Sequence, residues 1–234
     1  MTKVTYLDRS GYAVVTPSVI LVFDYFRDPA NALKKLLKAN PELPVVFLAT
    51  HHHADHFNPD IFDLAQDHKR LFVLSNDIES KHVPEKGLQV AWMAPGDVID
   101  GLLGGISVKA YKATFAGVCY TVTLTGGKKI FHGGDLNNSR CLGEETPRDL
   151  SKVRSEFETA VGRIAADSPE LDVAMMSVSP ESEEYAHYFL EKIKVDNFFP
   201  MHFEAKDDDD KDFNPDPECK VHSLHGPGQS DKID

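Results

Sequence analysis

A short apolar segment, Val45–Leu48, runs directly into a cluster of polar residues that starts at Thr50 and ends at His56. Its length and its valine and leucine content are typical of a buried β-strand. Asn58 and Pro59 then indicate the start of a helix, which we expect to continue to about residue 66. This order of strand, polar loop and helix is typical of layered α/β proteins, whose ligand sites favour the carboxyl ends of strands.

Other apolar runs, separated by turn residues, predict further strands and helices. The predicted strands are Val4–Leu7, Tyr12–Thr16, Val19–Phe23, Leu71–Leu74, Ile106–Tyr111, Val118–Leu124, Lys129–His132, Val173–Val178, Asn197–Phe203 and Val221–Leu224. Apolar residues at helical spacing predict helices over Glu145–Ala166 and Glu183–Ile193. Asp28 and Pro29 indicate the start of an earlier helix. The expected fold class is therefore α/β.

The size and charge of the chain limit its organisation and its partners. Its 234 residues, 41% of them hydrophobic, suffice for one substantial core, so we expect a single domain over residues 1–234. A polar segment near residues 205–218 is expected to be flexible. The net charge of −12 argues against nucleic-acid and anionic-membrane partners, since both attract basic surfaces. A small, anionic substrate remains compatible, because a bound divalent metal can dominate the local field.

The three cysteines and the N-terminus bear on the compartment. Cys119, Cys141 and Cys219 are too few and too scattered for a disulfide framework, which indicates reduced thiols. The first residues contain no positively charged leader followed by an apolar stretch. The apolar runs are also too short to span a bilayer. We therefore expect a cytoplasmic protein.

The polar cluster contains four potential metal ligands, namely His51, His53, Asp55 and His56. Imidazole and carboxylate groups suit zinc and other divalent ions. His51 and His53 would point the same way if strand geometry continues into the loop, whereas His52 would face away and is left out. A histidine-rich surface loop is the alternative explanation. The preceding buried strand and the nearby carboxylate favour a metal site.

Two further candidates are weaker when each is taken alone. Asp135 follows a predicted strand in the sequence His132-Gly133-Gly134-Asp135, where it could equally be a turn or capping residue. The two glycines permit close backbone approach, which a metal-binding loop can use. His202 is a single histidine near the end of a predicted strand, and such a histidine is more often structural than a ligand.

The order of these residues resembles the metallo-β-lactamase superfamily, over about residues 4–203, with the histidine cluster as the specific part. The resemblance implies a four-layer αβ/βα sandwich with a metal site along one edge of the sheets. It also implies the following ligands: His51 and His53 for a first metal, Asp55, His56 and His202 for a second metal, and Asp135 as the bridging carboxylate.

One segment departs from the pattern of the family. Another histidine ligand of the first metal usually precedes a strand resembling Val118–Leu124, but residues 111–117, YKATFAG, contain none. Lys112 is a poor substitute, because a protonated ammonium has no lone pair to donate. The first metal would then have His51, His53 and Asp135 with water, which is a known arrangement for catalytic zinc. A weakly held or absent first metal is equally consistent.

The resemblance implies hydrolysis of an ester, lactone, thioester, amide or phosphodiester bond by metal-activated water. The small cytoplasmic members, including the sugar-phosphate lactonase-like group, are the most similar. Asp55 is the candidate catalytic residue, since it could orient the water as well as bind metal. The expected cofactor is one or two divalent ions, zinc first, with manganese and iron as alternatives. The competing hypothesis is a metal-binding sensor or interaction protein that has lost catalysis.

Overall fold

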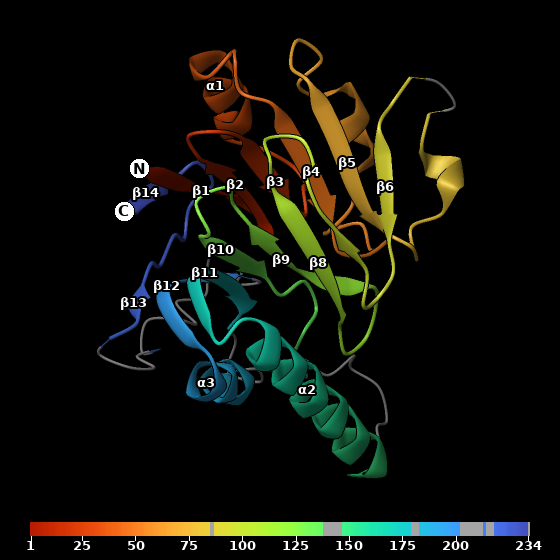
Figure 1. Ribbon diagram of the computed structural model, residues 1–234, viewed down its shortest axis with the longest axis vertical. Coiled ribbons are helices and arrows are strands. Elements are labelled where there is room, and N and C mark those ends of the chain that lie inside the picture. The colour runs from red at the N-terminus through yellow and green to blue at the C-terminus, as the bar shows by residue number, and fades with distance from the viewer. Residues whose placement is uncertain (85–86, 138–146, 179–182, 202–212, 214–217, 234) are drawn as a thin grey trace.

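The computed structural model describes residues 1–234 except 85–86, 138–146, 179–182, 202–212, 214–217 and 234, and only the backbone of residues 147–150. Two seven-stranded sheets form the centre of the described chain (Figure 1). In order across the first sheet, the strands are β14 (Ser230–Ile233), β1 (Thr2–Asp8), β2 (Gly11–Val15), β3 (Ile20–Phe23), β4 (Val45–Ala49), β5 (Arg70–Ser75) and β6 (Val90–Met93). Across the second sheet they are β13 (Lys220–Val221), β12 (Lys194–Met201), β11 (Glu170–Ser177), β10 (Lys129–His132), β9 (Val118–Thr123), β8 (Ser107–Lys112) and β7 (Val98–Ile99).

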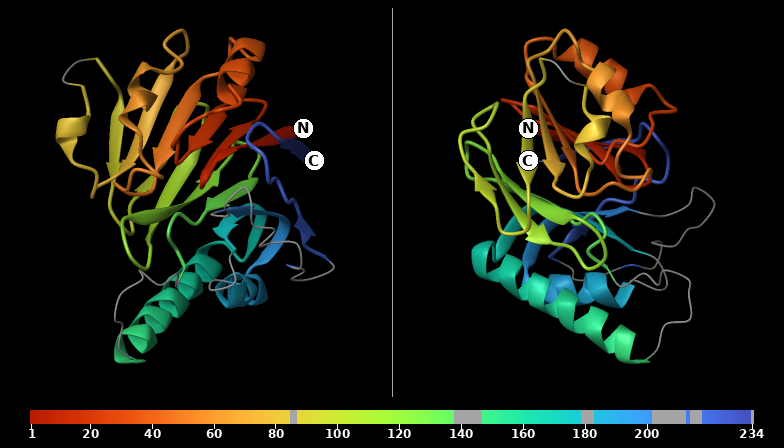
Figure 2. Two further views of the ribbon diagram at one scale, coloured as in Figure 1. Left: turned by 180° about the vertical axis from the view of Figure 1, so that it is seen from behind. Right: turned by 90° about the vertical axis from the view of Figure 1, so that its right-hand side faces the viewer.

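Helices cover the outer faces of the two sheets. The helix α1 (Ala32–Ala39) lies on the first sheet, and α2 (Pro147–Asp167) and α3 (Glu183–Lys192) lie on the second (Figure 2). The order of layers is thus helix, sheet, sheet, helix. The predicted four-layer αβ/βα sandwich is confirmed.

Three groups of buried apolar side chains fill the spaces between the layers. The side chains of the strand β4 contribute to two of these three groups. Val46 and Leu48 belong to the core between the sheets, whereas Phe47 and Ala49 belong to the core under α1. Successive side chains of a strand point to opposite faces, so a strand covered on both sides must be apolar throughout.

The strand directions bring several loops to one edge of the molecule. The strand β3 pairs in parallel with β4, and β10 pairs in parallel with β11, so Asp24, Thr50 and His132 all stand at carboxyl ends. The amide of Val118 donates to the carbonyl of Thr50 at 2.9 Å, which joins the two sheets. Gly134 lies so close that an added Cβ would be 2.7 Å from Thr50 Oγ1. The two sheets therefore converge at this edge.

The first helix begins later than the sequence predicts. The helix α1 starts at Ala32 rather than at Pro29, because Asn31 adopts a left-handed conformation with a φ of 52°. The carboxylate of Asp28 accepts hydrogen bonds from the amides of Ala32 and Leu33 at 2.7 and 2.9 Å. The predicted first residue was wrong, and Asn31, not Asp28, stands at the N-cap position, although the Asp28 side chain accepts from the first amides of the helix.

Other elements also differ from the prediction. The helix expected after the histidine cluster is a 3-10 helix, Pro59–Asp63. The strands β6, β7 and β14 were not predicted, because they are short and mostly half-exposed. The polar segment predicted near residues 205–218 lies outside the described residues, apart from Phe213 and Glu218. Within the described chain, no helix combines the length and apolar character needed to cross a membrane.

Candidate metal centre

Asp135 and the histidine cluster meet at the edge where the two sheets converge. His51 Nε2 lies 3.2 Å from Asp135 Oδ2, and His56 Nε2 lies 3.2 Å from Asp135 Oδ1. One ligand atom from each of the three residues lies within 4.8 Å of the others, which is close enough for one metal ion. Each carboxylate oxygen faces a different histidine. The carboxylate of Asp135 could therefore serve two metal positions, one beside each histidine.

His53 and Asp55 extend the cluster on opposite sides. His53 Nδ1 lies 3.0 Å from His51 Nε2 and 4.0 Å from Asp135 Oδ2. Asp55 Oδ2 lies 3.8 Å from His56 Nε2. The structure therefore brings together five of the six predicted site residues, with His51 and His53 near one oxygen of Asp135 and Asp55 and His56 near the other.

Three other histidines that the sequence brought into question are His202, His52 and His187. His202 lies outside the described residues, so its role as a ligand stays a prediction. His52 is exposed: its Nδ1 lies 2.9 Å from an oxygen of Asp77, and the edge of its ring contacts the ring of His53 with 4.7 Å between the centroids. His187 lies 3.3 Å from Glu183 on α3.

Asp24 is a member of this site that the sequence analysis missed. It is fully buried, and its Oδ2 lies 2.7 Å from both His56 Nδ1 and Thr50 Oγ1. Because a carboxylate only accepts, His56 Nδ1 and the Thr50 hydroxyl must both donate to it. The Thr50 oxygen lies 3.1 Å from His51 Nδ1 and can accept from that nitrogen in turn. Nε2 is therefore the nitrogen of each histidine that faces Asp135 and that a metal ion could bind.

A sequence signal for Asp24 did exist. It directly follows the predicted strand Val19–Phe23, as the histidine cluster follows Val45–Leu48. A lone aspartate at a strand end is common in turns, so that position alone does not mark a site. Its partner Thr50 lies 26 residues away, and the fold brings the two together through the parallel pairing of β3 and β4.

His132 supports the loop of Asp135 from the core. Its Nε2 donates to the carbonyl of Ser10 at 2.9 Å, and its Nδ1 accepts from the amide of Gly134 at 3.2 Å. Its ring stacks on Phe23 with 5.1 Å between the centroids. These contacts are those of a structural histidine at a strand end.

The charges at the site shift the pKa values of its groups. Burial lowers the pKa of His56, but the carboxylates of Asp24 and Asp135 outweigh burial and raise it to about 10. Burial acts to raise the pKa of Asp24, and the imidazoles of His132 and His56 hold it below the usual value. Partial burial and the adjacent histidines lower the pKa of His53. The site thus favours a positive charge beside His56 Nε2, either a proton or a metal ion.

Residues 111–117 pack against the cluster. Gly117 has a φ of 58°, and an added Cβ would lie 2.6 Å from the Cβ of His51. The hydroxyl oxygen of Thr114 lies 2.9 Å from the carbonyl of Asp135 and 2.5 Å from that of Asn137, and it accepts from the Asn137 amide at 3.1 Å. Among the described residues, the group able to share one ion includes none from this segment. The segment holds two ligand-bearing loops in place.

The fold matches solved structures over nearly the whole chain. Igni18, a metallo hydrolase from the archaeon Ignicoccus hospitalis KIN4/I, is 19% identical, with 100% of both chains covered and a TM-score of 0.69. A protein of Veillonella parvula DSM 2008, described as a possible metal-dependent hydrolase, is 12% identical, with 100% of both chains covered and a TM-score of 0.67. The metallo-β-lactamase fold protein YhfI from Bacillus subtilis is 14% identical, with 99% of this chain and 100% of YhfI covered and a TM-score of 0.63.

The chain therefore has the metallo-β-lactamase fold, as the sequence resemblance implies. No protein-family model matches the sequence, and no curated protein matches it either. At these identities the likeness is one of fold, and one fold carries many reactions. The chemistry has to be argued from the donor set of this chain.

Proposed function

We propose that this protein is a metal-dependent hydrolase that acts on an ester, lactone or phosphodiester-type bond of a small substrate. One observation carries the proposal: His51 Nε2 and His56 Nε2 each lie 3.2 Å from an oxygen of Asp135. Thr50 and Asp24 engage the Nδ1 atoms, so the Nε2 atoms are the ones that would bind a metal ion once they are deprotonated. Such a set is suited to a divalent cation, zinc first, with manganese and iron as alternatives.

The donors divide into two proposed metal positions. The first consists of His51, His53 and one oxygen of Asp135, and the second of Asp55, His56 and the other oxygen, with His202 as an expected addition. A divalent ion held there supplies positive charge that acidifies water and stabilises the negative charge developing on the substrate.

Asp55 is the proposed catalytic residue. Its side chain is 41% exposed, whereas that of His56 is 1% exposed, so Asp55 is the more accessible of the two to water and substrate. A carboxylate there can accept a hydrogen bond from the attacking water and take its proton. Asp24 and Thr50 meanwhile hold His56 and His51 in the required orientation.

The substrate and the compartment are proposed on broader grounds. The net charge of −12 favours a small molecule over nucleic acid, because nucleic acids bind to basic surfaces. An anionic small molecule is included, since the metal would offset the acidic surroundings. We place the protein in the cytoplasm.

A metal-binding sensor or interaction protein without catalysis is the second candidate. The histidine-free segment 111–117 favours it, because the first position is left with three protein donors. Both candidates bind metal, so metal content alone does not separate them. Turnover does.

The test is hydrolysis of a panel of lactones and of bis(p-nitrophenyl) phosphate by the full chain loaded with zinc, manganese or iron. We expect a chelator to abolish turnover and added metal to restore it. Loss of a residue that only supports a metal ligand typically lowers activity by up to about 100-fold. His56→Ala removes a ligand itself, so it should reduce turnover by more than that. His52→Ala is the matched control, since His52 pairs with Asp77 outside the cluster.

Turnover that resists both the chelator and His56→Ala would contradict the hydrolase proposal. Metal binding that depends on His56, without turnover on any substrate, would favour the sensor. His52→Ala should leave both metal binding and turnover at the level of the natural chain.

A further inference from the structure

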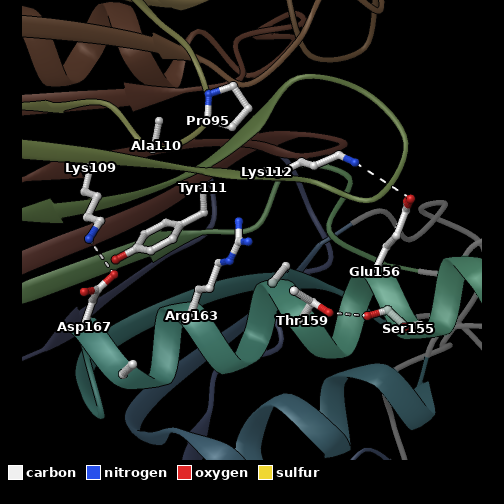
Figure 3. Close-up of a pocket in the computed structure, with 13 residues that line it drawn as sticks. Pro95, Lys109, Ala110, Tyr111, Lys112, Ser155, Glu156, Thr159, Arg163 and Asp167 are labelled. Carbon is white, nitrogen blue, oxygen red and sulfur yellow. Dashed lines mark hydrogen bonds and ion pairs between the residues drawn. The ribbon is translucent and has the colours of Figure 1, made fainter.

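A cavity lies between β8 and α2, with a volume of about 480 Å³ (Figure 3). None of its lining residues belongs to the metal centre. Pro95 and Ala160 supply apolar surface, and Tyr111 forms part of the wall on the side of the sheet, where β8 contributes only its backbone at Ala110. Cavities of this volume with a mainly apolar lining and a few polar groups are typical sites for small molecules.

Three cations line the cavity, and two of them already have a carboxylate partner. Lys109 Nζ lies 2.5 Å from an oxygen of Asp167, and Lys112 Nζ lies 3.8 Å from an oxygen of Glu156. These two pairs tie α2 to β8. The third cation, Arg163, makes no hydrogen bond or ion pair with any other described residue. The lining thus carries one positive charge in excess, on a chain with a net charge of −12.

Arg163 does not form an ion pair with a carboxylate on its own helix. Asp167 stands four residues further along α2, where it could pair with Arg163, but it pairs with Lys109 across the cavity. Arg154 on the same helix shows the ordinary case, with Nε 3.1 Å from Glu158 four residues away. Figure 3 shows the guanidinium of Arg163 extending from α2 toward β8 and Tyr111. It therefore offers its donors to the cavity.

We propose that this cavity binds a small organic monocarboxylate. The planar guanidinium of Arg163 matches a carboxylate with two parallel hydrogen bonds. Ala160, Pro95 and the ring of Tyr111 would contact the apolar body of the ligand. One unpaired cation suits one negative charge. A doubly charged phosphate is disfavoured, because the carboxylates of Glu156 and Asp167 also line the cavity.

The test uses phenylacetate as the probe, and phenylacetamide as a neutral probe of the same shape. Binding to the full chain is measured by calorimetry and mapped by amide chemical shifts. Arg163→Gln removes the unpaired charge, and Arg154→Gln is the matched control on the same helix, away from the cavity lining. His51→Ala is a third variant, because a carboxylate could also bind at the proposed metal centre.

We expect phenylacetate to shift the amides of Ala110 and Ala160, and Arg163→Gln to weaken its binding about 10-fold or more, as loss of a charged hydrogen bond does. Arg154→Gln and His51→Ala should bind phenylacetate as tightly as the natural chain does. Phenylacetamide should bind to the natural chain only weakly, about as weakly as phenylacetate binds to the Arg163→Gln variant. The proposal is overturned by equal binding of the two probes, by an unaffected Arg163→Gln, by shifts confined to the loop of His53 and Asp55, or by no saturable binding. None of these outcomes bears on hydrolysis at the metal centre.

Discussion

Asp24 Oδ2 lies 2.7 Å from His56 Nδ1, in a pair whose side chains are 0% and 1% exposed. This contact determines which nitrogen of His56 faces the site. Nδ1 keeps its proton, because Asp24 can only accept, and Nε2 faces Asp135 at 3.2 Å. A buried carboxylate behind a histidine is the usual partner of a metal-binding imidazole. The pair also explains why this histidine can be buried at all.

Replacing Asp24 by asparagine should weaken metal binding. The side chain keeps its size but loses the charge that orients His56, and loss of such a partner typically costs about 10- to 100-fold in metal affinity. Competition with a chromophoric chelator measures the effect. Asp77→Asn is the control, because Asp77 pairs with the exposed His52. Equal affinities for Asp24→Asn and Asp77→Asn would refute the role given to Asp24.

Metal affinity should rise with pH. Burial lowers the pKa of His56, but Asp24 and Asp135 raise it to about 10 in the metal-free protein. Metal must therefore displace a proton, and the affinity gains up to about tenfold per pH unit for each proton released, between about pH 6 and pH 8. Calorimetry in buffers of different ionisation enthalpy counts the protons. No proton release in that range would show that His56 is already neutral.

The free energy of unfolding of the metal-free protein should fall as the pH rises, whereas the metal affinity should increase. A histidine whose pKa is higher in the folded than in the unfolded state stabilises the fold fully below the unfolded value, which is about 6.5. That contribution is lost as the pH rises through the folded value of about 10 for His56. Urea unfolding of chelator-treated protein at several pH values tests this. A stability that increased over this range would contradict the buried ion pair.

Thr114 should position the loop of Asp135 through its hydroxyl. Thr114→Val keeps the shape but leaves the carbonyl of Asp135 and the backbone of Asn137 without this partner, at a cost of about 1–3 kcal/mol in the free energy of unfolding. Metal affinity should fall as well. Thr114→Ser retains the hydroxyl and should recover most of both losses. Failure of serine to restore affinity would assign the effect to packing instead.

Gly117→Ala should disturb the metal centre directly. The φ of 58° strains any side chain, and the new Cβ would lie 2.6 Å from the Cβ of His51. Gly127→Ala is the matched control, since Gly127 has a φ of 84° but no heavy atom within 4 Å of the added Cβ. Both should lose about 1–2 kcal/mol of stability from backbone strain, and Gly117→Ala should lose more, because its Cβ would also lie 2.0 Å from the carbonyl oxygen of Thr50. Only Gly117→Ala should also lose metal affinity, and equal affinities would contradict the packing against His51.

The sequence predicted those parts of the fold and site that depend on local patterns. Short apolar runs predicted the strands β3, β4 and β10, and with them the loops that carry His51, His56 and Asp135. The strands β6 and β7 were missed because their residues are half-exposed and gain stability from their neighbours in the sheet.

Contacts between distant segments were beyond local prediction. Asp24 could not be distinguished from a turn residue, because its function depends on Thr50 and His56, which the parallel pairing of β3 and β4 brings beside it. The lack of histidine in residues 111–117 was visible, but the supporting role of Thr114 was not. Its partners Asp135 and Asn137 are more than twenty residues away and are reached only in the folded chain.

The most direct test of the metal centre is a crystal structure of protein purified without chelator, with anomalous scattering recorded at the zinc, manganese and iron edges. We predict an anomalous peak about 2.0–2.2 Å from His56 Nε2 and from an oxygen of Asp135. A second peak near His51 and His53 would show that both positions are filled. Absence of any peak at these donors after incubation with the three metals would contradict the account.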